Sequence, residues 1–311
     1  MKNGGKFQGY FIIVIAVLTF SFSEVIVKFL QGSVGPIALS FFRFFIAGIF
    51  LLGILAIKKD LTGIIEMLKN NWFHFFISSF FAWGISNIVY FIGVGFTQAN
   101  TASTIYTTYP IWITIYSILL LHERSNLRLK FIGIVIGLIG VILLMSDITT
   151  LYSPELLFGN ILVLSSSIIW GLYSVLGKKI QNNERETSDV ELKFTMVSSF
   201  IASSPVFIVL IFSPEFPVFI SGYPLESWVW ILFMGAISTG LGLYLFFYGL
   251  KHVFEVSKGI SLAFLKPIFA TILAFIILSE IPSIILIISI CFVVVSIVLI
   301  NRNPETQNKI E

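Results

Sequence analysis

The stretch ANTASTIYTTYPIWITIYSILLLHE (Ala99–Glu123) decides the fold, because the stretch VSKGISLAFLKPIFATILAFIILSE (Val256–Glu280) repeats its pattern. In each copy a proline interrupts an apolar run, and a glutamate follows thirteen residues later. Pro110 and Pro267 are 157 positions apart, and so are the two glutamates, so the copies align without a gap. Each proline lacks a backbone N–H and is expected to break its helix. A repeat of about half the chain with such a break in corresponding places is typical of a transporter with internal symmetry.

The composition predicts a membrane protein rather than a soluble domain. Charged residues make up 11% of the 311 residues and hydrophobic residues 57%, whereas a soluble domain carries about 25% charged residues. At about 20 residues for each crossing, the chain has room for roughly ten membrane spans and for no separate soluble domain. The N-terminal apolar segment lacks a small-residue cleavage site, so we interpret it as a retained first span.

Ten apolar segments are long enough to be spans, and all should be helices because open strands leave unpaired backbone groups in lipid. They run approximately Gly9–Leu30, Pro36–Ile57, Trp72–Gly95, Asn100–Leu121, Leu129–Met145, Leu157–Gly177, Leu192–Phe212, Trp228–Leu250, Val256–Leu278 and Ser283–Ile300. The predicted fold class is therefore an all-α integral membrane protein with ten transmembrane helices.

The distribution of positive charge predicts the orientation. Of the 19 lysine and arginine residues, all except Lys28, Arg43 and Lys266 lie in segments that are cytosolic if the N-terminus is cytosolic, as the positive-inside rule requires. We therefore expect a multi-pass protein of the cell membrane with both termini in the cytoplasm. Five spans in each half is an odd number, so the second half should enter the membrane upside down. We divide the chain into two inverted five-helix repeats, residues 1–150 and 151–311.

Four ionisable residues, Glu24, Lys28, Arg43 and Lys266, lie within the predicted spans. Each costs at least about 2.5–3.5 kcal/mol at a helix centre, so each should face the bundle interior and have a partner. The structural interpretation is an ion pair between Glu24 and one of the three cations, of which Lys28 has the i, i+4 spacing. The functional interpretation is that Glu24 carries a coupling proton or binds a substrate amine. Three cations facing one acid would also let Lys266 and Arg43 hold an anionic group of the substrate.

Four motifs, in their order and spacing, point to a known family. They are PIALSFFRFFIAGIFLL (Pro36–Leu52), the Tyr109-Pro110 helix closed by HER (His122–Arg124), WGLYSVLGKK (Trp170–Lys179) and GLKH (Gly249–His252). Together they resemble the EamA family of the drug/metabolite transporter (DMT) superfamily. The resemblance implies a ten-helix bundle of two inverted five-helix repeats. It also implies a central cavity lined mainly by the first four helices of each half, and export or exchange of small metabolites, often amino acids.

The resemblance also suggests which residues line the cavity. With the charged residues above, the candidate substrate-binding set is Glu24, Arg43, Asn87, Tyr90, Tyr106, Tyr109, Trp170, Tyr173, Tyr244 and Lys266. An aromatic ring with a polar tip suits a pocket for a solute that is partly apolar and partly polar. For any one of these rings, core packing or a membrane-interface position is the alternative role.

A small-residue motif predicts close helix packing in the fifth span. Gly133 and Gly137 form G-x-x-x-G, and Gly140 follows. Such a motif lets two helix backbones approach each other, either within one chain or in a dimer. We accordingly expect a monomer or a homodimer.

The leading functional hypothesis is a secondary active transporter, an exporter or exchanger of a small organic metabolite such as an amino acid, that works by alternating access. A nucleotide-sugar or phosphorylated-solute exchanger is the alternative within transport, favoured by the excess of positive charge. No Walker loop, His/Cys metal cluster or nucleophile elbow occurs in the sequence, so we expect no cofactor, no metal and no enzymatic activity. An integral-membrane enzyme is the weak alternative from another class. Expected partners are the small-molecule substrate, the lipid bilayer and, in a proton-coupled mechanism, protons, but no nucleic acid.

Overall fold

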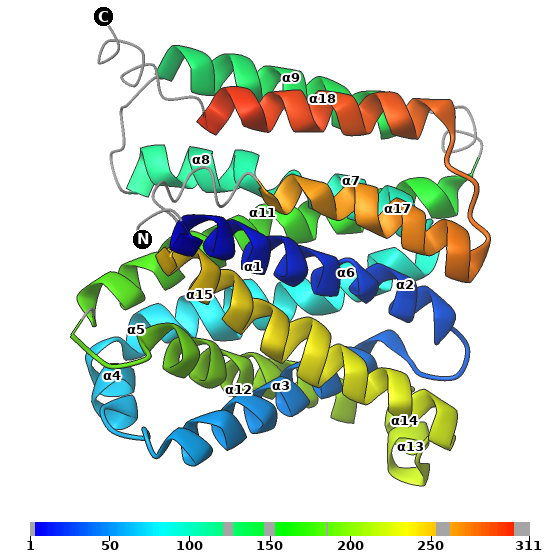
Figure 1. Cartoon of the computed structure of the whole chain (residues 1–311). Helices are drawn as coiled ribbons and strands as arrows, with labels where there is room; N and C mark the ends of the chain where they lie inside the picture. The colour runs from blue at the N-terminus through cyan, green and yellow to red at the C-terminus, as the bar shows by residue number, and fades with distance from the viewer. Residues whose placement is uncertain (1–3, 121–126, 146–152, 185, 253–261, 302–311) are drawn as a thin grey trace, which may run out of the picture.

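The computed structural model describes residues 4–120, 127–145, 153–184, 186–252 and 262–301. Within these ranges the chain is helical, with turns between the helices and no β-strand. The all-α prediction is confirmed for the described part. The helices lie roughly parallel or antiparallel to one another, and α1 begins at the same end of the bundle at which α18 ends (Figure 1).

The helices follow the predicted spans closely, although several spans consist of more than one helix. The elements before residue 146 are α1 (Gly4–Phe20), α2 (Phe22–Phe29), α3 (Pro36–Lys58), α4 (Ile64–Asn70), α5 (Trp72–Phe75), η1 (Phe76–Ile85), α6 (Ser86–Phe96), α7 (Ala99–Tyr106), α8 (Tyr109–Leu120) and α9 (Leu127–Met145). Those after it are α11 (Pro154–Asn183), α12 (Val190–Ile211), α13 (Phe216–Ser221), α14 (Leu225–Leu232), η2 (Phe233–Leu241), α15 (Gly242–His252), η3 (Leu262–Phe264), α17 (Leu265–Leu278) and α18 (Ile284–Asn301).

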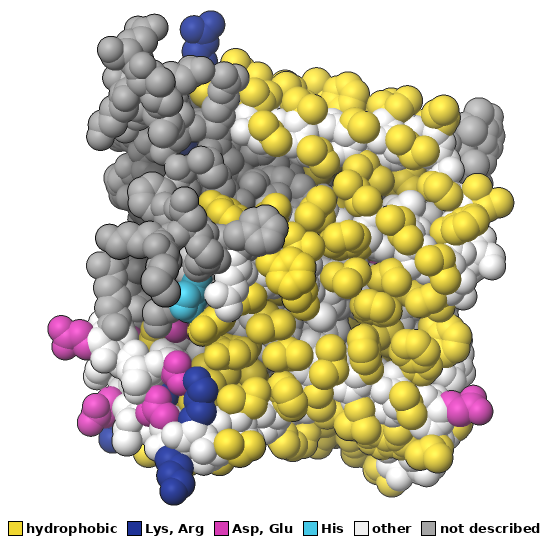
Figure 2. Space-filling view, viewed as in Figure 1, with side chains coloured by type: hydrophobic (Ala, Val, Ile, Leu, Met, Phe, Trp, Pro, Cys, Tyr) yellow, Lys and Arg dark blue, Asp and Glu magenta, His cyan; other side chains and the backbone are white. Residues whose placement is uncertain are grey.

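The surface of the bundle is suited to lipid. Among the described residues, six helical stretches are long and apolar enough to cross a membrane, and the apolar helices α17 and α18 are shorter. Hydrophobic side chains cover the middle of the face drawn in Figure 2, and most of its visible charged side chains gather at one end. Because large exposed side chains such as Phe11, Phe131 and Phe275 would be costly in water, the protein is a multi-pass membrane protein.

The fourth predicted span is two helices rather than one. Helix α7 ends at Tyr106 and α8 starts at Tyr109, so Pro110 lies in the first turn of α8, where a missing N–H costs little. At the break, the hydroxyls of Thr107 and Thr108 donate to the carbonyls of Ser103 and Ile105, at 2.7 Å each. The break predicted at Pro110 is therefore confirmed, and η3 and α17 meet in a similar way just before Pro267.

Two stretches of π-helix occur in the third and eighth predicted spans. They are η1 and η2, which begin 157 positions apart at Phe76 and Phe233. A π-helix is rare and usually a single turn, and it often marks a functional region. Each stretch packs against a helix of the other half of the chain, since η1 contacts α12 and η2 contacts α3.

The packing partners place the two halves of the chain across from each other. Helix α3 packs on α12, α6 on α11, and α1 on α15. A Cβ added at Gly93 of α6 would lie 2.9 Å from the carbonyl oxygen of Gly159 in α11. A Cβ added at Gly249 of α15 would likewise lie 3.1 Å from the carbonyl oxygen of Gly9 in α1. Glycine therefore allows the same close contact in both helix pairs.

Helices α9 and α18 form a separate layer on one side of the bundle (Figure 1). The G-x-x-x-G motif of α9 faces α18, because a Cβ at Gly133 would meet the Ser296 carbonyl oxygen at 2.6 Å and one at Gly137 the Ser296 hydroxyl at 2.6 Å. The Ser296 hydroxyl also donates to the Gly133 carbonyl, at 2.6 Å. The predicted close packing is confirmed, and it occurs within one chain.

Candidate functional site

A cavity of about 360 Å³ lies inside the bundle, between helices of the two halves. Its lining comes from α1, α2, α3, η1, α6, α7 and α8 on one side and from α11, α12, α15 and α17 on the other. The lining residues are Phe20, Ser23, Arg43, Trp83, Tyr90, Tyr106, Tyr109, Ile113, Trp170, Tyr173, Ser174, Val175, Gly177, Gln181, Glu191, Phe194, Leu243, Phe246, Phe247 and Lys266. The volume lies at the lower end of the range for small-molecule sites, about 300–1,000 Å³.

A buried ion pair closes one end of this cavity. The Lys266 ammonium lies 2.5 Å from Oε1 of Glu24, and the two side chains are 8% and 0% exposed, respectively. The hydroxyl of Tyr90 donates to the same carboxylate oxygen. The ammonium also lies 4.7 Å from the centre of the Tyr106 ring, a cation–π contact that further compensates its burial. The other carboxylate oxygen, Oε2 of Glu24, has no hydrogen-bond partner among the described residues.

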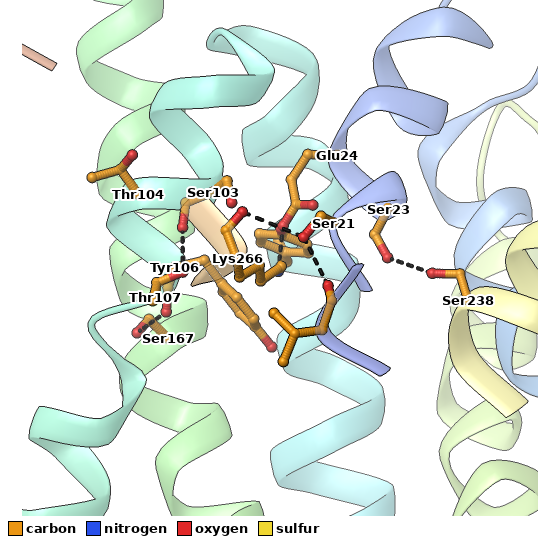
Figure 3. Close-up of polar contacts among 12 residues, drawn as sticks. Ser21, Ser23, Glu24, Ser103, Thr104, Tyr106, Thr107, Ser167, Ser238 and Lys266 are labelled. Carbon is orange, nitrogen blue, oxygen red and sulfur yellow. Dashed lines mark hydrogen bonds and ion pairs between the residues drawn. The ribbon is translucent and has the colours of Figure 1, made fainter. Parts of the chain in front are cut away.

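A bend in the first span brings this pair together. The hydroxyl of Ser21 donates to the Val17 carbonyl at 2.8 Å and to the Lys266 carbonyl at 3.3 Å. A serine bonded to the carbonyl four residues earlier bends a helix, and here α1 ends and α2 begins around that residue. The same hydroxyl ties the bend to the start of α17, so that Glu24 and Lys266 face each other (Figure 3).

Arg43 is held differently from Lys266. Its Nε donates to the hydroxyl of Thr239 in η2 at 2.8 Å, and its guanidinium carbon lies 5.3 Å from the centre of the Phe91 ring. It makes no ion pair with any residue that the structure describes. The charged end of the cavity therefore contains two cations and one acid, Glu24, and its formal net charge is positive.

Aromatic rings form most of the remaining wall. Tyr109 and Trp170 meet at a centroid distance of 4.5 Å, and Trp83 stacks on Tyr173 at 4.7 Å. Ring faces and edges of this kind bind planar apolar groups well. Two polar lining residues, Gln181 and Glu191, lie near the end of α11 and the start of α12.

The structure brings most of the predicted candidates together. The lining includes Arg43, Tyr90, Tyr106, Tyr109, Trp170, Tyr173 and Lys266, and Glu24 contacts two of them. Asn87 is buried on α6 but is not among the lining residues. Tyr244 is also outside the lining, and its ring lies 5.9 Å from the ammonium of Lys58.

Of the ion pairs that the sequence left open for Glu24, the one with Lys266 forms and the one with Lys28 does not. The Lys28 ammonium donates instead to the Gly95 carbonyl at 3.0 Å and to the Gln31 side chain at 3.2 Å. Lys28 is one turn nearer the helix end and partly exposed, so hydration and a carbonyl satisfy it without a carboxylate. The acid pairs instead with Lys266, whose side chain is only 8% exposed.

Sequence reasoning missed several residues of the site. Thr239 has no charge or aromatic ring to mark it, and only the fold places it beside Arg43. Phe246 and Phe247 lie in a phenylalanine-rich run whose members look alike in the sequence. The proline offset of 157 does not hold here, because α6 and α15 begin 156 positions apart, so only the structure shows that Phe246 is the counterpart of Tyr90.

Ionic contacts join the loops at the end predicted to be cytosolic. Lys58 pairs with Asp189 at 2.5 Å, and Lys193 pairs with Asp60 at 2.7 Å. The hydroxyl of Ser188 also donates to Asp60, at 2.7 Å. The hydrogen bond from Lys193, followed by the one from Ser188, lowers the pKa of Asp60. Since the Lys193 side chain is fully buried, this carboxylate is its required counterion.

Two glutamates bind helix N-termini at the opposite end. The carboxylate of Glu215 accepts from the backbone N–H of Ala38 at 2.8 Å, and that of Glu280 accepts from the N–H of Ala99 at 3.1 Å. Negative charge is favourable at the positive end of a helix dipole. Burial raises the pKa of Glu215, and the N–H bonds partly offset this effect.

The fold and the cavity define the class of the protein as a helical membrane protein with a solute-sized internal site. Comparison with known proteins then assigns the family. A family model described as the EamA-like transporter family matches twice, over residues 7–146 and 157–302. The chain therefore belongs to the EamA-like transporter family.

Its relatives are also named transporters. An uncharacterized transporter of Clostridium kluyveri is 24% identical, with 97% of this chain and 96% of that protein covered. The uncharacterized transporter YetK of Bacillus subtilis is 28% identical over 90% of this chain and 84% of its own length. A solved crystal structure with 19% identity covers 98% of this chain and 99% of its own, with a TM-score of 0.66, which supports the fold. The protein is thus a membrane transporter.

Proposed function

We propose that the chain consists of two inverted five-helix repeats, residues 1–150 and 151–311, which together make ten transmembrane helices. The family model matches each half once. The π-helical stretches start 157 positions apart, as do the breaks near Pro110 and Pro267. The close glycine contact between α6 and α11 also has a counterpart between α15 and α1. A pseudo-two-fold axis in the membrane plane, which relates the two repeats, accounts for these paired features.

We infer that the protein is a secondary active transporter that exports or exchanges a small organic metabolite, such as an amino acid, by alternating access. The observation that carries this inference is the cavity of about 360 Å³ with a charged end, enclosed between the two halves. Binding sites of transporters with inverted repeats lie near the bilayer midplane at the repeat interface, beside discontinuous helices. The cavity lies beside three interrupted spans: α1–α2, α7–α8 and η3–α17.

The contacts at the two ends support a state in which the outer side is closed. The carboxylates of Glu215 and Glu280 hold the N-termini of α3 and α7 at the end predicted to be outside. The cavity instead runs from Lys266 toward Gln181 and Glu191, at the end predicted to be cytosolic. In an alternating-access cycle the outer contacts would have to break before the solute could leave to the outside.

Glu24 is the candidate coupling residue. Its carboxylate binds Lys266 and Tyr90, so that a proton or a solute amine would have to compete with both donors. A proton on Glu24 would release Lys266 and add to the positive charge beside Arg43. This sequence of events would couple protonation to anion binding. The competing role is a permanent structural pair, and transport by the double variant Glu24→Gln/Lys266→Met separates the two.

The orientation is tested by accessibility labelling in intact cells. After Cys291 is replaced by serine, single cysteines at Ser33 and Ser221 should react with an impermeant thiol reagent. A cysteine at Asn70 should react only after the cells are permeabilised. All three positions are exposed, so lack of reaction reports sidedness rather than burial. A labelled Asn70 position in intact cells would contradict the cytosolic termini and the inverted repeats.

The transport function is tested with the full chain in proteoliposomes. The assay measures counterflow of amino acids, organic acids, sugar phosphates and nucleotide sugars, with protein-free liposomes as the control. We expect counterflow of a metabolite of about amino-acid size, because the cavity is at the small end of the range for ligand sites. Counterflow of a nucleotide sugar would instead support the exchanger alternative. Turnover of a bilayer lipid without any solute movement would support the enzyme.

A further inference from the structure

The repeat relates the two ends of the cavity to each other residue by residue. The first and sixth spans match at an offset of 150, and the breaks at Pro110 and Pro267 match at 157. The helices α6 and α15 begin 156 positions apart, so the counterparts of Glu24, Lys266 and Tyr90 are Ser174, Tyr109 and Phe246. All three counterparts line the cavity. The site therefore has an end with the ion pair and Arg43 and, at the symmetry-related position, a largely aromatic part whose lining also includes Glu191.

The charged end has one cation to spare. Glu24 and Lys266 neutralise each other, and the excess of one positive charge belongs to Arg43. Only the Nε of Arg43 has a hydrogen-bond partner among the described residues, the hydroxyl of Thr239. The two terminal nitrogens of a guanidinium match the two oxygens of a carboxylate. The geometry suits one carboxylate and leaves the existing ion pair intact.

The part of the cavity that the repeat relates to the charged end is mainly aromatic. Tyr109 and Trp170 contact each other at 4.5 Å between ring centres, and Phe246 and Phe247 lie 5.9 Å apart. All four rings line the cavity. Rings favour offset or edge-to-face contact with another ring, whereas a sugar or a short aliphatic chain would leave them poorly covered. A volume of about 360 Å³ is suited to one ring system rather than several.

We propose that the solute of this transporter is a small aromatic carboxylate. Its carboxylate binds the terminal nitrogens of Arg43, and its ring packs against Trp170, Tyr109 and Phe247. This inference rests on the proposed transport function and deepens it. The carboxylate and the ring of the solute are required. An amine near the carboxylate is optional: if it is present, it can donate to Oε2 of Glu24, an acceptor without a partner in the described structure.

A matched set of solutes tests the inference in proteoliposomes at pH 7. Tyrosine and 3-(4-hydroxyphenyl)propionate carry both groups and differ in the amine. Tyramine lacks the carboxylate, lactate lacks the ring, and glucose 6-phosphate is a dianion without a ring. We expect protein-dependent uptake of one or both aromatic acids to exceed that of the other three by about tenfold or more, since a charge-assisted hydrogen bond contributes that much. Uptake of tyrosine alone would show that the amine is recognised.

Variants locate the two binding groups. Arg43→Gln should lower uptake of the aromatic acid by about tenfold or more, and Arg43→Lys should retain part of it. Trp170→Leu should raise KM, whereas Trp72→Leu, at a ring that is 64% exposed on the outside of the bundle, should leave it unchanged. If Arg43→Gln does not fold, Thr239→Val keeps the charge but releases Nε, and should raise KM severalfold.

The outcomes separate this inference from the function on which it rests. Uptake of tyramine, lactate or glucose 6-phosphate in preference to the aromatic acids would overturn the substrate class and leave a transporter. Unchanged KM in both Thr239→Val and Trp170→Leu would overturn the placement of the two groups. Absence of uptake for every solute of this set and of the wider metabolite panel would overturn the transport function, and the inference with it.

Discussion

Removing the charge of Glu24 should destabilise the protein strongly, and removing Lys266 as well should restore most of the loss. The carboxylate of Glu24 is fully buried and accepts from both Lys266 and Tyr90. In Glu24→Gln the Lys266 ammonium, only 8% exposed, keeps its charge without a counterion. Breaking a buried pair in this way costs about 3–5 kcal/mol, whereas replacing both partners by uncharged groups is often nearly neutral.

The expected size of the effect can be measured by thermal unfolding of the purified protein in detergent. Taking roughly 2.1 cal/mol/K per residue for the unfolding entropy, 3–5 kcal/mol over 311 residues corresponds to a fall in Tm of about 5–8 °C. Glu24→Gln and Lys266→Met should each show this fall. The double variant Glu24→Gln/Lys266→Met should unfold close to the wild type. Lys28→Met, at a lysine bound only by a carbonyl and Gln31, is the matched control and should change Tm little.

Two results would refute this reasoning. Single variants that unfold at the wild-type temperature would mean that the pair does not hold the native structure together. A double variant that loses the sum of the two single effects would mean that Glu24 and Lys266 do not interact. If the double variant is as stable as the wild type but does not transport, the pair has a role in the transport cycle beyond stability. If it transports with unchanged pH dependence, Glu24 does not carry the coupling proton.

Two further predictions concern the rest of the bundle. Lys193 lowers the pKa of Asp60, so the stabilisation by this pair is present above the unfolded pKa of about 3.9 and is lost as the pH falls through the lowered pKa of the folded protein. The Tm difference between Asp60→Asn and the wild type should therefore stay constant from pH 8 to 5 and shrink below about pH 4. A change in this difference between pH 5 and 8 would contradict the assignment. Gly137→Leu should destabilise the protein by at least about 1–3 kcal/mol in denaturant unfolding, because a Cβ there would lie 2.4 Å from the Ile111 side chain and 2.6 Å from the Ser296 hydroxyl. Gly53→Leu is the control, since nothing lies within 4 Å of a Cβ added at Gly53. Equal effects at both glycines would contradict the packing argument.

The helical architecture could be predicted from the sequence because the solvent is lipid. Long apolar runs with rare charges must be helices in a membrane, and helices lie along the predicted runs in the described part of the chain. The break near Pro110 was visible as a missing N–H. The bend at Ser21 was not, because nothing in the sequence shows that the Ser21 hydroxyl bonds to the Val17 carbonyl, or that it also reaches the carbonyl of Lys266, a residue 245 positions away.

The candidate site could be predicted in composition but not in its pairing. Rare charges inside spans identify Glu24, Arg43 and Lys266, because burial of a charge needs a reason. Which cation binds the acid depends on tertiary distance, so the sequence left Lys28, Arg43 and Lys266 open, and the structure selects Lys266. The partner of Arg43 is a threonine that nothing in its sequence context distinguishes.

The different environments of the two cavity cations imply different roles in a transport cycle. Arg43 can bind an anion without losing any existing ion pair, because Thr239 occupies only its Nε. Lys266 can bind an anion only after the 2.5 Å contact with Glu24 is broken. An anionic solute should therefore engage Arg43 first, and its negative charge would then compete with Glu24 for the ammonium. This competition would weaken the bond between α2 and α17, the two helices that the pair joins. Binding at Arg43 is thereby linked to separation of helices from the two halves, which is what alternating access requires.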